Sequence, residues 1–153
     1  MCSMAYIAFS GSFEHSLDGK GRVIIPASFR EALSDNFTIT INPTRTAVAI
    51  YPKADWDGQL ERLSHINPMD KIGLQYERYL MSVSFSGNSM DAQGRVLIPA
   101  KLRAKIGLTR DIVFVGLNHY IEVGDAEVYA KMEAQTEDEF DSLVDYVYEK
   151  YPS

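Results

Sequence analysis

The chain has 153 residues, of which 46% are hydrophobic and 24% are charged, as in a folded globular protein and unlike a disordered one. No apolar run approaches the roughly 20 residues that span a bilayer, and we expect no secretory signal at the N-terminus. Because Cys2 is the only cysteine, an intramolecular disulfide cannot form. We therefore expect a cytoplasmic protein with no membrane partner.

The net charge of −6 is unevenly distributed along the chain. From Glu122 to Lys150 there are 10 acidic and 2 basic residues, whereas residues 1–121 carry 13 basic and 11 acidic ones. The acidity belongs to the C-terminal segment, and the rest of the chain is mildly basic. The net charge therefore does not exclude a nucleic-acid partner.

Two segments of the chain repeat each other. Residues 16–30 (SLDGKGRVIIPASFR) and 89–103 (SMDAQGRVLIPAKLR) are identical at 9 of 15 positions at an offset of 73. Unrelated segments would match at about one position. The match resumes downstream, where Val48, Ile50 and Trp56 align with Ile121, Val123 and Tyr129. The chain is a tandem duplication.

The first half of each copy predicts a strand, a tight turn, a buried strand and a short helix. Glycine and aspartate in residues 18–21 and 91–94 suit a turn with positive φ angles. The apolar runs that follow predict strands at 22–25 and 95–98. Pro26 and Pro99 then predict helix starts, and Gly107 predicts the end of the second helix.

The second half of each copy predicts a β-hairpin followed by a helix. The hairpins pair residues 37–41 with 47–51, and residues 112–115 with 120–123. Asp55 is the predicted cap of the first helix. Residues 68–82 predict an amphipathic connecting helix, and residues 136–139 (TEDE) predict a capping box that opens the last helix.

A unit of about 50 residues with such short strands buries little apolar surface alone. We therefore expect a mainly β protein with peripheral α-helices, in which both repeats close one pseudo-two-fold β-barrel without free sheet edges. The expected parts are an N-terminal extension (1–8), the first repeat (9–66), a connecting helix (67–82), the second repeat (83–130) and an acidic C-terminal helix (131–153).

The paired Asp-x-x-Gly-Arg-Val-x-Ile-Pro-Ala strings, from Asp18 and from Asp91, resemble the MraZ family of the AbrB-like swapped-hairpin barrel group. This resemblance implies a nucleoid-associated transcription factor that binds direct repeats in its own promoter. The promoter lies ahead of the cell-division and cell-wall gene cluster, which the family typically represses. The resemblance also implies ring-shaped oligomers. It assigns DNA contacts to the Asp-x-x-x-Arg region, which here means Asp18, Lys20, Arg22, Asp91 and Arg95.

The predicted DNA-binding residues are Lys20, Arg22, Arg95 and Lys101. Asp18, Gly19, Gly21, Asp91 and Gly94 are predicted to shape the turns, with each aspartate orienting an arginine. An alternative interpretation of Asp18 with Arg22, and of Asp91 with Arg95, is an ion pair that only stiffens its turn. Gln93 replaces the lysine at the position of Lys20, so the first turn should bind DNA more strongly.

The remaining basic residues of the second motif, Arg103, Lys105 and Arg110, suit a solvated helix face or non-specific attraction to phosphate, as does Lys101. His15, His65 and His119 lack the spacing of metal ligands, so we expect no metal, cofactor or small-molecule substrate.

Two other classes of protein share features with this sequence. Duplicated aspartates occur in aspartic proteases, but the hydroxyl residue that follows their aspartate is absent here. An arginine beside each aspartate also opposes proton sharing, so we expect no enzyme. An AbrB-like antitoxin or a general nucleoid-binding protein is the alternative function.

Overall fold

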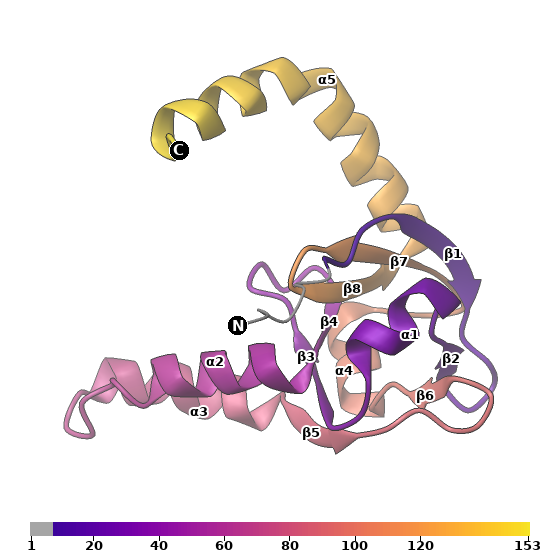
Figure 1. Ribbon diagram of the computed structural model, residues 1–153, viewed down its shortest axis with the longest axis horizontal. Coiled ribbons are helices and arrows are strands. Elements are labelled where there is room, and N and C mark those ends of the chain that lie inside the picture. The colour runs from indigo at the N-terminus through magenta and orange to yellow at the C-terminus, as the bar shows by residue number, and fades with distance from the viewer. Residues whose placement is uncertain (1–7) are drawn as a thin grey trace, which may run out of the picture.

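Residues 8–153, which the computed structural model describes, form two antiparallel β-sheets with helices around them (Figure 1). The first repeat contributes β1 (Ser12–Ser16), β2 (Arg22–Ile24), α1 (Ala27–Leu33), β3 (Phe37–Ile41), β4 (Val48–Tyr51) and α2 (Lys53–Leu63). After the connecting helix α3 (Lys71–Ser82) come β5 (Phe85–Asn88), β6 (Arg95–Leu97), α4 (Ala100–Ile106), β7 (Asp111–Leu117), β8 (Tyr120–Asp125) and α5 (Ala126–Lys150). The expected N-terminal extension, except its last residue, and Cys2 lie outside the described residues.

The two repeats exchange strands. The larger sheet has the order β1-β7-β8-β4-β3-β5. The corresponding strands of the two repeats therefore occupy symmetric positions: β1 and β5 at the two ends, β7 and β3 next to them, and β8 and β4 in the middle. At its centre Ala49 lies opposite Glu122, and in the smaller sheet Val23 lies opposite Val96. Each of these residues faces its own counterpart in the other repeat. The register therefore has the symmetry of the duplication.

One hydrophobic core lies between the larger sheet, the β2–β6 sheet and the helices α1 and α4. Both repeats supply its largest fully buried side chains, among them Phe29, Leu33, Phe37, Ile50, Leu102, Ile112, Phe114 and Ile121. Helix α4 stops at its C-cap Gly107, as the sequence predicted, and Gly107 adopts the left-handed conformation there (φ 80°, ψ 32°). The strands of one half thus pack on helices and strands of the other.

The prediction of a closed barrel is wrong. In residues 8–153, β1 pairs only with β7 and β5 only with β3, so the larger sheet keeps two open ends. The physical reason is the turn after β1, which leads the chain into β2. Because β2 pairs with β6, these two strands form a separate ribbon over the core instead of closing the larger sheet.

Two predicted helix starts are also wrong. Helix α2 begins at Lys53 after Pro52, so Asp55 lies in its first turn. Helix α5 begins at Ala126, where the carboxylate of Asp125 accepts a hydrogen bond from the N–H of Val128 at 3.1 Å. The predicted capping box at 136–139 lies inside this helix, because the Ala- and Glu-rich residues before it favour helix and continue directly from β8.

Two helical parts extend from the body. Helices α2 and α3 form a projecting arm, and α5 leaves the body beside β7 and β8 and then arcs away (Figure 1). Neither α3 nor α5 has a buried residue. Among the helices of residues 8–153, none has the length and apolar character needed to cross a membrane.

Candidate nucleic-acid interface

Asp18 organises the turn between β1 and β2. Its Oδ1 accepts hydrogen bonds from the backbone N–H of Lys20 and of Arg22, both at 2.9 Å, and its Oδ2 accepts one from Arg22 Nε at 2.7 Å. Gly21 donates its N–H to the Asp18 carbonyl at 3.0 Å and has a φ of 83°, which glycine adopts without strain. The turn is therefore fixed, with Gly19 and Lys20 exposed.

Asp91 builds the same turn in the second repeat. Its Oδ1 accepts from the N–H of Gln93 at 2.9 Å and of Arg95 at 2.8 Å, and its Oδ2 accepts from Arg95 Nε at 2.7 Å. Gly94 has a φ of 78°. The two turns differ in charge, because an uncharged Gln93 stands where the first turn has a lysine.

The hydrogen bonds keep both aspartates ionised. The backbone N–H of Arg22 is the largest cause that lowers the pKa of Asp18 from its ordinary 3.8 to about 2, and the Arg22 side chain adds to it. The backbone N–H and side chain of Arg95 likewise lower the pKa of Asp91. Each aspartate is thus ionised and paired with the arginine of its own turn. This differs from a protease dyad, in which two aspartates share one proton.

The two turns lie at opposite ends of the β2–β6 ribbon. Beyond the paired strands, Ile25 N–H donates to the Gly94 carbonyl at 2.9 Å, and Ile98 N–H donates to the Gly21 carbonyl at 3.0 Å. Each turn is therefore hydrogen-bonded to the strand of the other repeat. The position of each arginine depends on both halves of the chain.

The outer face of the ribbon carries both arginines. Side chains alternate along a strand, so the burial of Val23 and Val96 in the core places their neighbours on the opposite, outer face. These neighbours are Arg22, Ile24, Arg95 and Leu97. The side chains of Arg22 and Arg95 are each 32% exposed, so solvent reaches both while an aspartate holds them.

A second pair of arginines packs under the turns. Arg103 of α4 donates its Nε–H to the Ile98 carbonyl at 3.0 Å, and its guanidinium fills the space where a Cβ on Gly21 would stand. Arg30 of α1 donates its Nε–H to the Ile25 carbonyl at 2.9 Å and lies in the same way against Gly94.

Arg30 and Arg103 occupy equivalent, identical positions of the two repeats. This identity was the sequence signal for their shared role, and the interpretation of Arg103 as part of a solvated helix face overlooked it.

Lys101 lies outside this arrangement. Its Nζ donates to the Ser82 carbonyl at 2.9 Å, at the end of α3. The equivalent position of the first repeat is Ser28, which is uncharged. The structure therefore brings the other predicted residues together in two turns on one ribbon and joins Lys101 to the connecting helix.

The histidines have separate surroundings. His15 packs edge-on against the ring of Phe114, while His65 lies 3.5 Å from Glu61 and His119 lies 3.3 Å from Asp55. Within the part of the chain that the structure describes, no group of three or more His, Cys, Asp or Glu side chains is placed to hold a metal ion.

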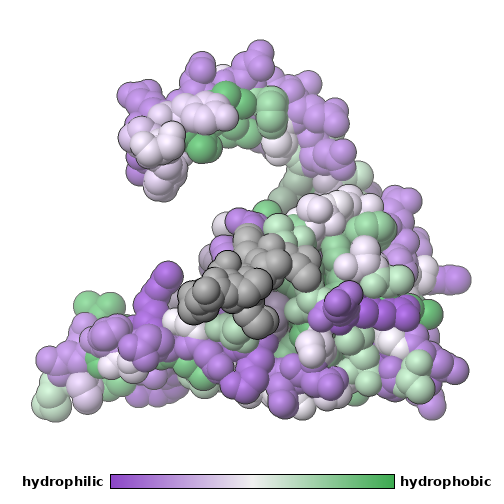
Figure 2. Space-filling view, in the orientation of Figure 1, coloured by the Kyte–Doolittle hydropathy of each residue, from purple (hydrophilic) through white to green (hydrophobic). Residues whose placement is uncertain are grey.

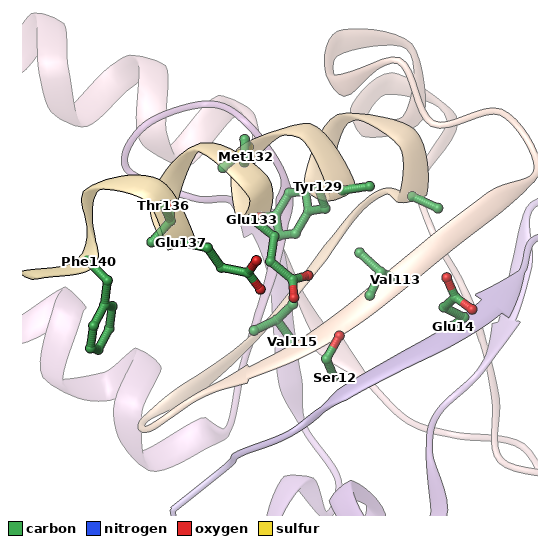
Figure 3. A pocket seen from close by; sticks show the side chains of 12 residues that line it. Ser12, Glu14, Val113, Val115, Tyr129, Met132, Glu133, Thr136, Glu137 and Phe140 are labelled. Carbon is green, nitrogen blue, oxygen red and sulfur yellow. The ribbon is translucent and has the colours of Figure 1, made fainter.

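A groove of about 1060 Å³ lies between α5 and the strands β1 and β7 (Figure 3). Val113 and Val115 line it from the sheet, and Glu133, Glu137 and Phe140 line it from α5. Further along α5 the apolar residues stay exposed, namely Leu143, Tyr146 and Val147. Figure 2 shows hydrophobic groups on the inner side of the α5 arc and polar groups on its outer side.

A smaller groove of about 390 Å³ lies where α2 and α3 meet the β3–β4 turn. Tyr51, Trp56 and Tyr76 line it together with Tyr79, whose ring lies 5.8 Å from Lys105 Nζ. Arg45 also lines this groove. Its surface is aromatic and basic, whereas that of α5 is apolar and acidic.

Curated relatives along nearly the whole chain are named as transcriptional regulators. Transcriptional regulator MraZ of Lachnoclostridium phytofermentans is 36% identical over 141 residues, which are 92% of this chain and 96% of that protein. The proteins of the same name from Natranaerobius thermophilus (32% over 139 residues, 91% and 96%) and Pediococcus pentosaceus (34% over 137 residues, 90% and 94%) are similar.

The sequence model described as "MraZ protein, putative antitoxin-like" matches residues 8–72 and 86–145. The chain therefore belongs to the MraZ family, as the paired motifs predicted. The relatives' names make this a family of transcriptional regulators and not one of enzymes.

Proposed function

We propose that this chain is a sequence-specific DNA-binding transcriptional regulator that binds direct repeats as a ring oligomer. It represses its own promoter, ahead of a cluster of cell-division and cell-wall genes. The observation that carries the proposal is the exposed β2–β6 ribbon with its two aspartate-held arginines. The B-DNA major groove, roughly 12 Å wide, admits a two-stranded ribbon of this kind.

The two arginines that pair with aspartates are suited to recognise guanine by hydrogen bonds. Asp18 accepts a hydrogen bond from the Nε–H of Arg22, and in residues 8–153 the structure shows no hydrogen bond from the terminal nitrogens of that guanidinium. These nitrogens have the geometry for a bidentate contact with guanine O6 and N7. Because Asp18 already orders the side chain, DNA binding avoids part of an entropy cost of about 0.5–1.5 kcal/mol. Arg95 and Asp91 repeat the arrangement.

Phosphate contacts would position the ribbon on the duplex. Lys20 is exposed between two glycines, where a DNA backbone can approach closely. Arg30 and Arg103 add positive charge beneath the turns. Lys101 has a lesser part in the proposal, as one more basic group near the start of α4.

Assembly supplies the affinity that one subunit lacks. The apolar face of α5 and the aromatic groove beside α3 are two different uncovered surfaces of opposite charge character. Uncovered apolar surfaces of this kind mark interfaces. A contact between two different surfaces is head-to-tail, and it closes a ring when the rotation allows.

One alternative function has a specific observation in its favour, because the matching family is described as putative antitoxin-like. In an AbrB-like antitoxin, the acidic α5 would bind a toxin encoded by the neighbouring gene. A general nucleoid-binding protein would instead coat DNA without preference for sequence. A toxin gene next to this one would favour the antitoxin.

Footprinting on the DNA immediately upstream of the gene tests the proposal. We expect protection of short direct repeats that persists in an excess of unrelated DNA and is lost in a variant with both Arg22→Ala and Arg95→Ala. Uniform protection of any DNA would favour the nucleoid-binding alternative, and no protection would contradict DNA regulation at this promoter.

A further inference from the structure

The outer face of the ribbon carries two large aliphatic side chains beside the arginines, and the proposed arginine contacts with DNA do not explain why these side chains are exposed. Ile24 is 46% exposed and Leu97 is 55% exposed. Leu97 lies directly opposite Arg22, and Ile24 lies directly opposite Arg95. Each arginine of one repeat is thus paired across the ribbon with an aliphatic residue of the other repeat.

This combination restricts the partner that fits the face. A purely apolar partner would leave the terminal nitrogens of both guanidinium groups without hydrogen bonds, and removing such charged groups from water is costly. A purely anionic partner would leave both aliphatic side chains in water. The DNA major groove offers both kinds of group, since base edges accept hydrogen bonds from arginine and thymine presents a C5-methyl group.

We propose that Ile24 and Leu97 contact thymine methyl groups in the major groove and so add thymine to the sequence that the ribbon recognises. The inference rests on the proposed DNA binding and extends it from guanine to a second base. The register fixes the pairing: Ile24 reads a thymine beside the guanine of Arg95, and Leu97 reads one beside the guanine of Arg22.

The geometry also limits the spacing between the two bases. Residues directly opposite each other on antiparallel strands have Cβ atoms about 4.5–5.5 Å apart. Successive bases of one DNA strand rise by about 3.4 Å. Each thymine should therefore lie within one or two base steps of the guanine that the facing arginine contacts.

The test removes the methyl group from the DNA, which leaves the protein unchanged. Duplexes that span the footprint carry deoxyuridine in place of each thymine in turn, and the affinity of the full-length protein is measured for each. One or two substitutions should weaken binding about fourfold, the loss expected for one methyl group withdrawn from an apolar contact. The remaining substitutions should leave the affinity unchanged.

Variants then connect each methyl group to its side chain. In Ile24→Ala, the duplex with deoxyuridine at the thymine that Ile24 contacts should bind as tightly as its parent, because the side chain that senses this methyl group is gone. Leu97→Ala should do the same at the thymine that Leu97 contacts. Leu117→Ala is the matched control, since Leu117 is also an exposed aliphatic residue (43%) but lies on β7. It should keep the fourfold difference, and circular dichroism checks the fold of every variant.

The possible failures are distinguishable. A footprint without thymine at the required spacing, or a deoxyuridine effect of equal size in wild type and both ribbon variants, overturns the inference while DNA binding stands. If the unmodified duplex does not bind at all, the proposed function fails, and the inference fails with it.

Discussion

At the scale of single residues, the two Asp–Arg turns share their hydrogen bonds and differ in charge. Lys20 stands at the first turn and Gln93 at the second, while the aspartate-to-arginine distances are the same 2.7 Å. Any difference between the turns in DNA affinity should therefore come from the lysine and from the strand neighbours, and not from how the arginines are held.

We expect Arg22→Ala to weaken operator binding more than Arg95→Ala. Lys20 attracts phosphate beside Arg22 and should place that end of the ribbon closer to the duplex, so more contacts are lost with Arg22. Gel-shift titrations at one salt concentration measure the difference. Equal losses, or a larger loss for Arg95→Ala, would contradict the expected asymmetry.

The ion pair of Asp18 makes the first turn sensitive to acid. Because the folded-state pKa of Asp18 is lowered from 3.8 to about 2, its stabilising effect is complete above about pH 4 and is lost as the pH falls through about 2. The difference in free energy of unfolding between wild type and Asp18→Asn should therefore shrink between pH 4 and pH 2. Urea unfolding over this range measures it, and a constant difference would show that the pair contributes nothing.

Local patterns predicted the two turns. Asp18, Gly21 and Arg22 stand within five residues, so the turn could be inferred from the motif, and the duplication repeated the inference at Asp91. The contact of Arg103 with Gly21 was missed because it joins the two repeats across the ribbon, and no local pattern encodes which half of a duplicated chain a side chain will meet.

At the scale of elements, the sequence predicted the strands and hairpins, because their apolar alternation and turn residues are local. The barrel prediction failed at a non-local choice. Pairing of β2 with β6 depends on two three-residue strands from different repeats, and such short strands carry no signal for their partner. The predictions of the starts of α2 and α5 were wrong because each helix begins almost directly after the preceding strand, before the residues whose pattern suggested a cap.

The packing of α4 against the first turn gives a prediction for glycine. Gly21→Ala forces an L-residue to a φ of 83° and pushes on the Arg103 guanidinium. The expected cost in free energy of unfolding is about 1–3 kcal/mol. Gly19→Ala is the control in the same turn, because a Cβ there meets nothing within 4 Å. Thermal unfolding of both variants measures the difference in stability. Equal melting temperatures would contradict the role of the close contact between Gly21 and Arg103.

At the scale of the whole molecule, the exposed apolar face of α5 predicts self-association. Light scattering should return a mass well above the 17.2 kDa of one chain, and larger than that of a dimer. Phe140→Asp with Val147→Asp should reduce the mass, because both residues are exposed and their loss does not disturb the core. Asp145→Ala, on the opposite side of the helix, should not. A mass of one chain at micromolar concentration would contradict the ring.

A ring also predicts how operator spacing acts. One subunit offers few cationic contacts and should bind near the non-specific range of about 10⁻⁴–10⁻⁶ M. Several ribbons on one ring raise the avidity by about 10²–10⁴ when they engage repeats on the same side of the duplex. Inserting half a helical turn, about 5 bp, between repeats should therefore collapse affinity although every base remains. Unchanged binding in a gel shift would rule out avidity.

The strand exchange between the repeats also affects how the chain is made. Strand β1 leaves the ribosome early, but its only partner in the described chain, β7, belongs to the second repeat. At about 5–20 residues per second, β1 waits on the order of ten seconds for β7, and the wholly buried strand β3, which pairs at once with β4, waits about half as long for β5 on its other side. A nascent first repeat is thus an unfinished sheet with apolar strands in water, and it needs shielding during translation. The duplication repeats the Asp-x-x-x-Arg motif, yet it makes folding a single event that waits for the strands of the second repeat.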